Sequence, residues 1–169
     1  YVLSGNGVAL TGGLAALNNA VAGANAVNLD ISFGAAVPTI VCASDGTLYL
    51  GGAVDNGGLR LNVASEGATT FSGALSGAGG LNITSAGTVT LSGGSITYTG
   101  ATTVEAGRQV LSDTTGFDSS IEDNAIAEYA VSSGVVFLQG GHSLTGDGML
   151  VKSGSGLLCI GGPGGAGNR

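Results

Sequence analysis

Charged side chains are scarce in this chain of 169 residues, at 9% of the total, and only four of them are basic. The eleven acidic residues leave a net charge of −7. Binding to nucleic acid requires clustered lysine and arginine, whereas Arg60, Arg108, Lys152 and Arg169 are scattered, so nucleic acid is a poor partner for this chain. Serine, threonine and asparagine fill the polar positions instead, a composition that favours an extracellular protein.

Long apolar runs are missing too. No stretch of about 18 apolar residues is present, so no membrane span is predicted. The opening residues, Tyr1-Val-Leu-Ser, lack the basic start and the apolar run of a signal peptide. If the protein is secreted, we expect its signal to have been removed or to lie outside this sequence.

Glycine is abundant, with 34 residues, while proline occurs only twice. There is no Gly-X-Y period, which excludes collagen, and the alternating apolar pattern in a chain that is 43% hydrophobic excludes simple disorder. The glycines are expected at corners, where the backbone turns sharply or neighbouring backbones come close.

One short phrase recurs along the chain: a glycine, then about five residues of alternating apolar and polar type, then usually another glycine. Successive copies are 21, 20, 20, 27 and 22 residues apart, and they begin at Gly46, Gly67, Gly87, Gly107, Gly134 and Gly156. A period near 20 that is made of strands and turns is typical of a solenoid, because each coil buries its inward side chains only against its neighbours.

A longer comparison supports the repeat. Residues 75–93 align without a gap on residues 144–162, an offset of 69 residues or about three coils, and glycines and apolar residues match while polar ones differ. Further short alternating segments, such as Leu59–Val63 and Leu81–Ile83, give three strands per coil. The predicted fold is therefore all-β: a right-handed parallel β-helix (β-solenoid) with about eight coils of about 20 residues.

We expect a single β-helix domain over residues 1–162. Residues 1–45 carry a weaker version of the pattern and are predicted to form irregular N-terminal coils, while the glycine-rich residues 163–169 are predicted to be a tail. The two cysteines, Cys42 and Cys159, would lie about five coils apart, or roughly 24 Å at ~4.8 Å per stacked strand. A disulfide needs Cα atoms within about 7 Å, so they are not expected to pair within one chain.

The 27-residue step between Gly107 and Gly134 predicts an enlarged loop over residues 112–133. Almost half of the acidic residues fall here, with two aromatic residues among them. Because loops on a rigid scaffold carry most binding chemistry, this segment is the candidate binding loop, with a plain solvated loop as the alternative. Its candidate residues are Asp113, Phe117, Asp118, Glu122, Asp123, Glu128 and Tyr129.

Residues 75–111 contain Leu-Ser-Gly-Ala-Gly-Gly-Leu, Gly-Thr-Val-Thr-Leu-Ser-Gly, Tyr-Thr-Gly and Thr-Thr-Val-Glu-Ala-Gly. This stretch resembles the passenger-associated repeat of bacterial autotransporters, and the segment from His142 to Gly156 looks similar. The resemblance implies a right-handed β-helical passenger segment that is exported to the cell surface. Because these repeats belong to the stalk, it carries no catalytic residue over to this chain.

Enzymatic readings are weaker. The lone His142 lies on a glycine turn and is expected to be a surface turn residue rather than a catalytic base. Asp45, Glu66 and Glu105 precede repeated strands and could stack at one corner, where their carboxylates would suit Ca²⁺ or the chemistry of a carbohydrate-active enzyme. The alternative is that they are ordinary turn residues, and no cofactor or metal site is predicted.

The sequence thus favours a non-enzymatic, extracellular structural or adhesive β-helix module. One alternative is a filament subunit that stacks end to end, since the last strands of a parallel β-helix have open edges. A second alternative is a carbohydrate-active enzyme. The expected partners are further copies of the chain or ligands on host or neighbouring cell surfaces.

Overall fold

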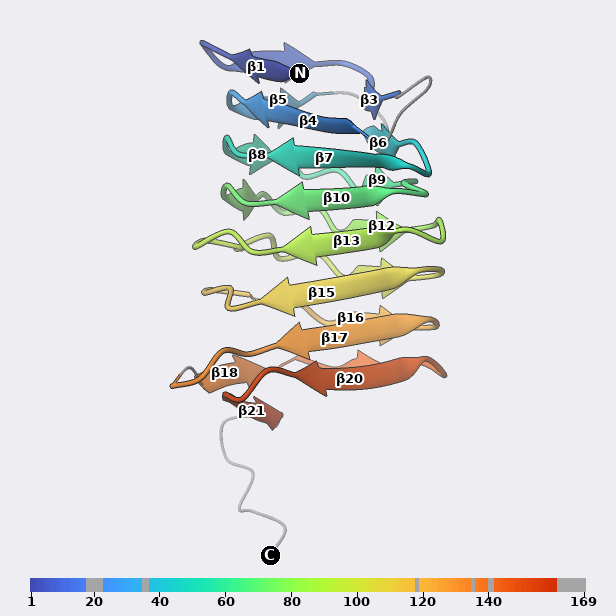
Figure 1. The fold of residues 1–169 in the computed structure, drawn as a ribbon, viewed down its shortest axis with the longest axis vertical. Helices are drawn as coiled ribbons and strands as arrows, with labels where there is room; N and C mark the ends of the chain where they lie inside the picture. Colours follow the sequence, from blue (N-terminus) through green and yellow to red (C-terminus); the bar gives the residue numbers. More distant parts are fainter. Residues whose placement is uncertain (18–22, 35–36, 118, 135, 140–141, 161–169) are drawn as a thin grey trace, which may run out of the picture.

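The computed structural model describes residues 1–17, 23–34, 37–117, 119–134, 136–139 and 142–160, which contain strands and no helix. All paired strands run parallel, and each sheet is built from successive turns of the chain stacked on one another (Figure 1). The chain is therefore a β-solenoid, which confirms the predicted all-β, parallel and repetitive architecture. No helix that could cross a membrane is present in the described ranges.

The sheet facing the viewer in Figure 1 has eight strands, and a second sheet behind it has seven. The eight-stranded sheet consists of β1 (Val2–Ser4), β4 (Gly23–Asn28), β7 (Gly46–Leu50), β10 (Ala68–Phe71), β13 (Thr88–Leu91), β15 (Arg108–Ser112), β17 (Ile126–Ala130) and β20 (Met149–Ser153). The seven-stranded sheet consists of β3 (Leu14–Ala16), β6 (Thr39–Cys42), β9 (Leu61–Val63), β12 (Leu81–Ile83), β14 (Thr102–Val104), β16 (Ile121–Asp123) and β19 (Leu144–Thr145).

The third side of the solenoid is interrupted. A four-stranded sheet contains β2 (Val8–Leu10), β5 (Ile31–Phe33), β8 (Val54–Asp55) and β11 (Leu75–Ser76), and a two-stranded sheet contains β18 (Val136–Gln139) and β21 (Leu157–Ile160). In chain order these strands follow the eight-stranded sheet, and all but the last lead into the seven-stranded one. Between the two small sheets, an isolated bridge from Leu75 to Ile96 is the one strand-like pairing on this side among the described residues.

The length of a turn varies along the solenoid. In the eight-stranded sheet the pairing advances by 20 residues from Thr70 to Thr90, by 18 from Val110 to Glu128 and by 23 from Glu128 to Val151. The first four glycine phrases, from Gly46 to Gly107, stack in this sheet as the period predicts. The last two, at Gly134 and Gly156, lead instead into β18 and β21 of the two-stranded sheet.

The two segments that align at an offset of 69 residues therefore have similar sequences but lie on different sides of the solenoid. The segment 81–83 lies in the seven-stranded sheet, and its sequence counterpart 150–152 lies in the eight-stranded one. Likewise β13 belongs to the eight-stranded sheet and its counterpart β21 to the two-stranded one. All three sides require the same pattern, alternation bounded by glycine corners, so one motif can form a strand on any of them.

The segment 112–133 differs from the expected enlarged loop. It contains β16 and the paired strand β17, so it supplies strands to both large sheets. Its acidic residues suggested a loop, but several of their carboxylates accept hydrogen bonds from other residues of the solenoid. The first 45 residues include β1 to β6, which pair in the same sheets as the later strands, and the predicted tail lies outside the described residues.

The core runs along the inside of the stack. Inward side chains of successive strands lie above one another, as in the column Leu50, Phe71, Leu91 and Leu111, each of which is about 1% exposed or less. Outward positions of the same strands hold Thr70 and similar polar residues. The alternation of apolar and polar residues in the sequence thus gives each strand one buried face and one solvent-facing face.

The glycine corners are explained by close approach of neighbouring turns. A Cβ atom on Gly87 would lie 2.1 Å from the carbonyl oxygen of Gly67 in the preceding turn. At Gly107 the backbone has a φ of +71°, and a Cβ would lie 2.4 Å from the carbonyl oxygen of Gly87. Both distances are shorter than any side chain permits, so the 20-residue glycine period is a packing requirement of the corner.

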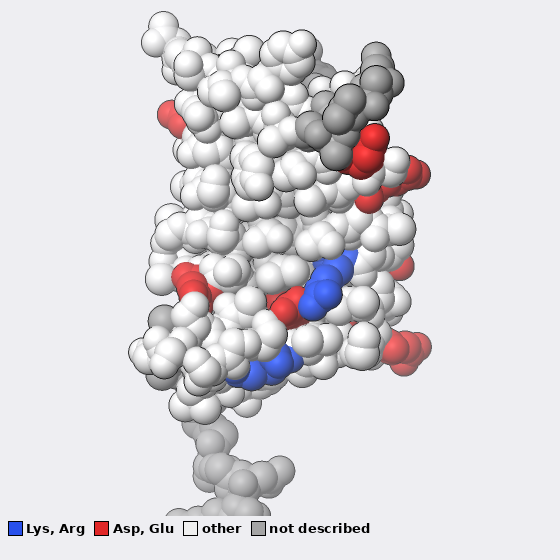
Figure 2. All heavy atoms as spheres, viewed as in Figure 1, with Lys and Arg blue, Asp and Glu red and all other residues white. Residues whose placement is uncertain are grey.

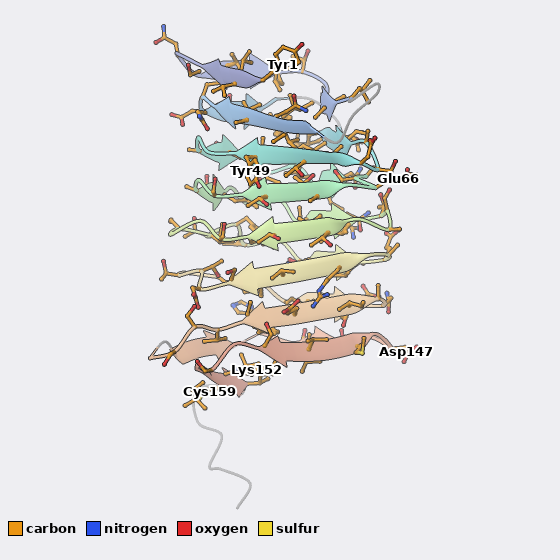
Figure 3. All side chains as sticks on the ribbon, viewed as in Figure 1. Tyr1, Tyr49, Glu66, Asp147, Lys152 and Cys159 are labelled. Atoms are coloured by element: carbon orange, nitrogen blue, oxygen red, sulfur yellow. The ribbon has the colours of Figure 1, made fainter. Side chains whose placement is uncertain are left out.

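One part of the interior is polar. The hydroxyl of Tyr98 makes a 2.6 Å hydrogen bond with Thr102 Oγ1, which makes a 2.9 Å hydrogen bond with Ser119 Oγ. Burial raises the pKa of Tyr98, an effect that these hydrogen bonds partly offset. Both cysteines are free, as expected: Cys42 is buried in the core and Cys159 is exposed at the C-terminal end (Figure 3).

Candidate functional site

Of the seven residues predicted to form a binding loop, the six that the structure describes do not gather at one place. Phe117 packs edge-on against Tyr98, with ring centroids 6.0 Å apart, on the border of the core. Tyr129 is fully buried in the inward column that contains Leu111. Asp118 lies outside the described residues. The two aromatic side chains therefore stabilise the scaffold and do not form a binding platform.

Asp113 and Asp123 complete corners. Asp113 has a φ of 49°, in the left-handed region that aspartate tolerates better than most residues, and its carboxylate accepts hydrogen bonds from the amide (2.8 Å) and the hydroxyl of Ser132. The hydroxyl contact, followed by the amide, lowers the pKa of Asp113. The carboxylate of Asp123 is buried and accepts hydrogen bonds of 3.1 Å from the amides of Ala125 and Ala127.

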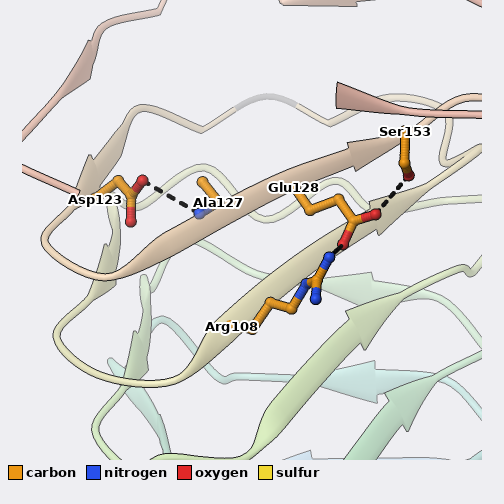
Figure 4. Close-up of polar contacts among 5 residues, drawn as sticks. All are labelled: Arg108, Asp123, Ala127, Glu128 and Ser153. Carbon is orange, nitrogen blue, oxygen red and sulfur yellow. Dashed lines mark hydrogen bonds and ion pairs between the residues drawn. The ribbon is translucent and has the colours of Figure 1, made fainter. Parts of the chain in front are cut away.

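Glu128 joins three turns of the eight-stranded sheet on its outer face. Its carboxylate pairs with the guanidinium of Arg108 in the preceding turn and accepts a hydrogen bond from the hydroxyl of Ser153 in the following turn (Figure 4). The side chain is only about 10% exposed. Glu128, a predicted binding-loop residue, thus holds neighbouring turns together. Charged side chains are otherwise few on this face (Figure 2).

Glu122 is the one predicted residue that lies exposed on an outer face and borders a hollow. The hollow has a volume of about 540 Å³ and opens on the seven-stranded sheet; we call it the outer groove. Its lining residues are Arg60, Gly80, Ala101, Thr103, Glu105, Glu122 and Asn124. They belong to four successive turns of the chain.

Strand register explains how these residues meet. Asn62, Asn82, Thr103 and Glu122 are paired partners at the outward position of β9, β12, β14 and β16. They form a polar column along the solenoid, with a spacing of about 4.8 Å between turns.

One arginine and two small residues flank this column on one side, and acidic and amide residues flank it on the other. Arg60, Gly80 and Ala101 immediately precede β9, β12 and β14, one position before the strands begin. Glu105 and Asn124 immediately follow the paired residues Val104 and Asp123. The hollow therefore results from the absence of large side chains at Gly80 and Ala101.

The side chain of Arg60 reaches across this hollow to the next two turns. Its Nη2 atom donates a 2.6 Å hydrogen bond to Thr103 Oγ1 and a 3.4 Å hydrogen bond to Asn82 Oδ1. Thr103 and Asn82 are almost completely buried under it, at 8% and 9% exposure. The groove thus presents a guanidinium anchored through Nη2 on one side and the side chains of Glu105, Glu122 and Asn124 on the other. The last two contact each other, since Asn124 Nδ2 donates a 3.5 Å hydrogen bond to Glu122 Oε1.

Most of the groove was not apparent in the sequence. Arg60 and Thr103 are 43 residues apart, and Gly80 and Ala101 carry no chemical signal of their own. The alternation in Leu59–Val63 placed Arg60 and Asn62 outward, which was the available clue. Only the register, which sequence alone left open, brings these positions together.

The corner carboxylates do not form a continuous ladder. Glu66 and Asp45 each lie two residues before a paired residue, Ala68 and Thr47, so they match in neighbouring turns. Glu105 lies two turns further on, and the turn between, at residues 84–86, contains no acidic residue. Within the part of the chain that the structure describes, no three His, Cys, Asp or Glu side chains are grouped as a metal site would require.

No protein-family model matches this sequence, and neither a curated protein nor a solved structure matches it.

Proposed function

We propose that the chain is a non-enzymatic structural and adhesive module of a bacterial protein that is exported to the cell surface, with the architecture of an autotransporter passenger. On this proposal the solenoid is right-handed, in keeping with the usual hand of connections between parallel strands, and has about eight coils. The turns act as a stiff rod that displays its outer faces to partners.

The supporting observation is that conspicuous polar groups are engaged between turns. Asp113 binds Ser132 in the next turn, and Glu128 binds Arg108 and Ser153 in the turns on either side of it. Asp123 binds amides at the corner of its own turn. The contacts of Asp113 and Glu128 couple neighbouring turns in the C-terminal half, and together with the continuous apolar core they favour a mechanical role.

Antibody labelling of intact and permeabilised cells of the source organism tests the location, and inhibition of cell attachment by the purified chain tests the adhesive role. We expect labelling of intact cells and a dose-dependent loss of attachment. Labelling only after permeabilisation would overturn the proposal. The attachment control is an unrelated acidic β-protein of similar size.

A filament subunit is the second candidate, and the apolar ends of the solenoid favour it. Among the described residues, nine of eleven exposed large apolar side chains lie in the first or the last turn. They are Tyr1, Val2, Leu3, Val8, Leu17, Met149, Leu150, Leu157 and Ile160. Figure 3 shows Tyr1 at one end and Lys152 and Cys159 at the other.

Head-to-tail stacking would continue the parallel ladders, because the free edges of β1 and β20 belong to one sheet with one strand direction. Electron microscopy over a range of concentrations distinguishes the two candidates. Uniform fibres with a repeat of about 4.8 Å along the axis would favour the filament, and discrete short rods at every concentration would favour the module.

A further inference from the structure

We propose that the outer groove binds a neutral glycan chain that runs along the solenoid axis. This inference rests on the proposed adhesive function and assigns to it a site and a class of ligand. It is carried by the shape of the groove, by the hydrogen-bonding groups on its walls and by its charge.

The shape is fixed by the backbone. A Cβ atom on Gly80 would lie 2.2 Å from the carbonyl oxygen of Ala101, so a side chain cannot fill the floor at this position. Ala101, in the next turn, contributes only a methyl group. Because the two residues belong to adjacent turns of a packed solenoid, the floor of the hollow is part of the rigid scaffold, while the charged side chains around it are exposed.

The walls offer donors and acceptors at close spacing. Arg60 is donor-only, Glu105 and Glu122 are acceptors when ionised, and Asn124 and Thr103 can act as both. Sugar hydroxyls also donate and accept, so a chain of sugars can bond to both walls at once. Successive turns repeat every ~4.8 Å, and the groove draws on four of them, so an extended ligand along the axis meets all of these groups.

The charge of the groove disfavours an acidic ligand. The groove carries two carboxylates against one guanidinium, and Nη2 of that guanidinium already donates to Thr103 and Asn82. The whole chain carries −7. A polyanion such as a uronic acid chain would meet repulsion from Glu105 and Glu122, whereas a neutral chain would not.

Affinity is expected to be modest. None of the described residues that line the groove is aromatic, so they do not supply the stacking that strengthens many sugar sites. We expect a dissociation constant of about 0.1–1 mM for a single short oligosaccharide, a range in which display of many copies on one surface raises the overall strength of attachment.

Nuclear magnetic resonance titration of the ¹⁵N-labelled chain tests the site. The neutral probes are cellohexaose, maltohexaose and chitohexaose, and the acidic probe is hexagalacturonate. We expect at least one neutral probe to shift the amides of Gly80, Ala101, Thr103 and Asn124, and hexagalacturonate to shift none of them. Absence of shifts with every neutral probe, or shifts confined to another face, would overturn the inference.

Two variants sharpen the test. Ala101→Leu fills the hollow from an exposed position and should weaken binding about tenfold or more, and Glu122→Gln should weaken it less. Ala68→Leu, on the outer face of the eight-stranded sheet, adds the same side chain elsewhere and should bind like the wild type. Equal binding by Ala101→Leu and Ala68→Leu would remove the groove from the proposal. Surface labelling of intact cells is measured independently, so loss of the groove and failure of the proposed function are distinguishable.

Discussion

The middle turns and the two terminal turns have the same backbone arrangement but differ in how far their inward side chains are buried. Leu50 and Leu3 occupy the same inward column, and Leu50 is 1% exposed whereas Leu3 is 59% exposed. At the other end Leu150 also faces inward, below Ala127, and is 45% exposed. Inward orientation alone therefore does not bury a side chain in a solenoid; the adjoining turn does.

The largest effect is expected from a core truncation in the middle. Phe71→Ala should lower the free energy of unfolding by about 3–5 kcal/mol, because Phe71 is covered by turns on both sides. Leu3→Ala, in the uncovered first turn, should change it by only about 0.5 kcal/mol. Urea unfolding followed by circular dichroism measures both, and equal losses would contradict the comparison.

The next effect concerns glycine. A Cβ on Gly79 would lie 1.8 Å from the carbonyl oxygen of Leu59 in the preceding turn, while a Cβ on Gly12 meets no atom within 4 Å. Gly79→Ala is expected to cost about 3 kcal/mol and Gly12→Ala to change stability by less than about 0.5 kcal/mol. Thermal melting of the two variants beside the wild type checks this, and a tolerated Gly79→Ala would refute close packing of the corners.

Sequence alone predicted what is local to a turn. Alternation identified strands such as 88–91, and the glycine period identified corners, because both features are repeated in each turn. It did not predict on which side a motif lies, as the counterparts β13 and β21 show, since every side accepts the same pattern.

Contacts between turns were also not predicted from the sequence. Glu128 was interpreted as a loop residue because its partners, Arg108 and Ser153, are 20 and 25 residues away. The outer groove was missed for the same reason, since Arg60 and Thr103 meet only through the register of three strands. Residues that act across turns leave no pattern within one turn.

A smaller effect is expected from pH. Tyr129 lies in the last fully covered layer, where burial, and secondarily the charge of Asp123, raises its pKa to about 12. An unfolded tyrosine ionises near pH 10, so between pH 10 and 12 the unfolded state binds fewer protons and stability falls as pH rises. The contribution is fully present below about pH 10.

We expect the alkaline loss to be about 1 kcal/mol at pH 11 and to shrink in Tyr129→Phe, which cannot ionise. Urea unfolding at pH 8 and at pH 11 measures the difference. A Tyr129→Phe protein with an unchanged alkaline slope would show that other groups, Tyr98 among them, account for it.

The smallest effect on stability, but a distinct one on association, is expected at the C-terminal end. Lys152 occupies the inward column below Tyr129, and its Nζ donates hydrogen bonds to the carbonyl oxygens of Ser153 (3.0 Å) and Gly154. Inward charges at an open edge oppose further strand addition. The C-terminal edge is thus protected by a charge.

Lys152→Leu should change the free energy of unfolding by about 0.5 kcal/mol or less, because the position is exposed, yet it should promote concentration-dependent association. Lys152→Arg keeps the charge and should sediment like the wild type. Sedimentation velocity over a range of concentrations separates these outcomes. If Lys152→Leu sediments as a monomer at every concentration, the apolar ends are insufficient for stacking. The terminal turns would then differ from the middle turns only in the burial of their inward side chains.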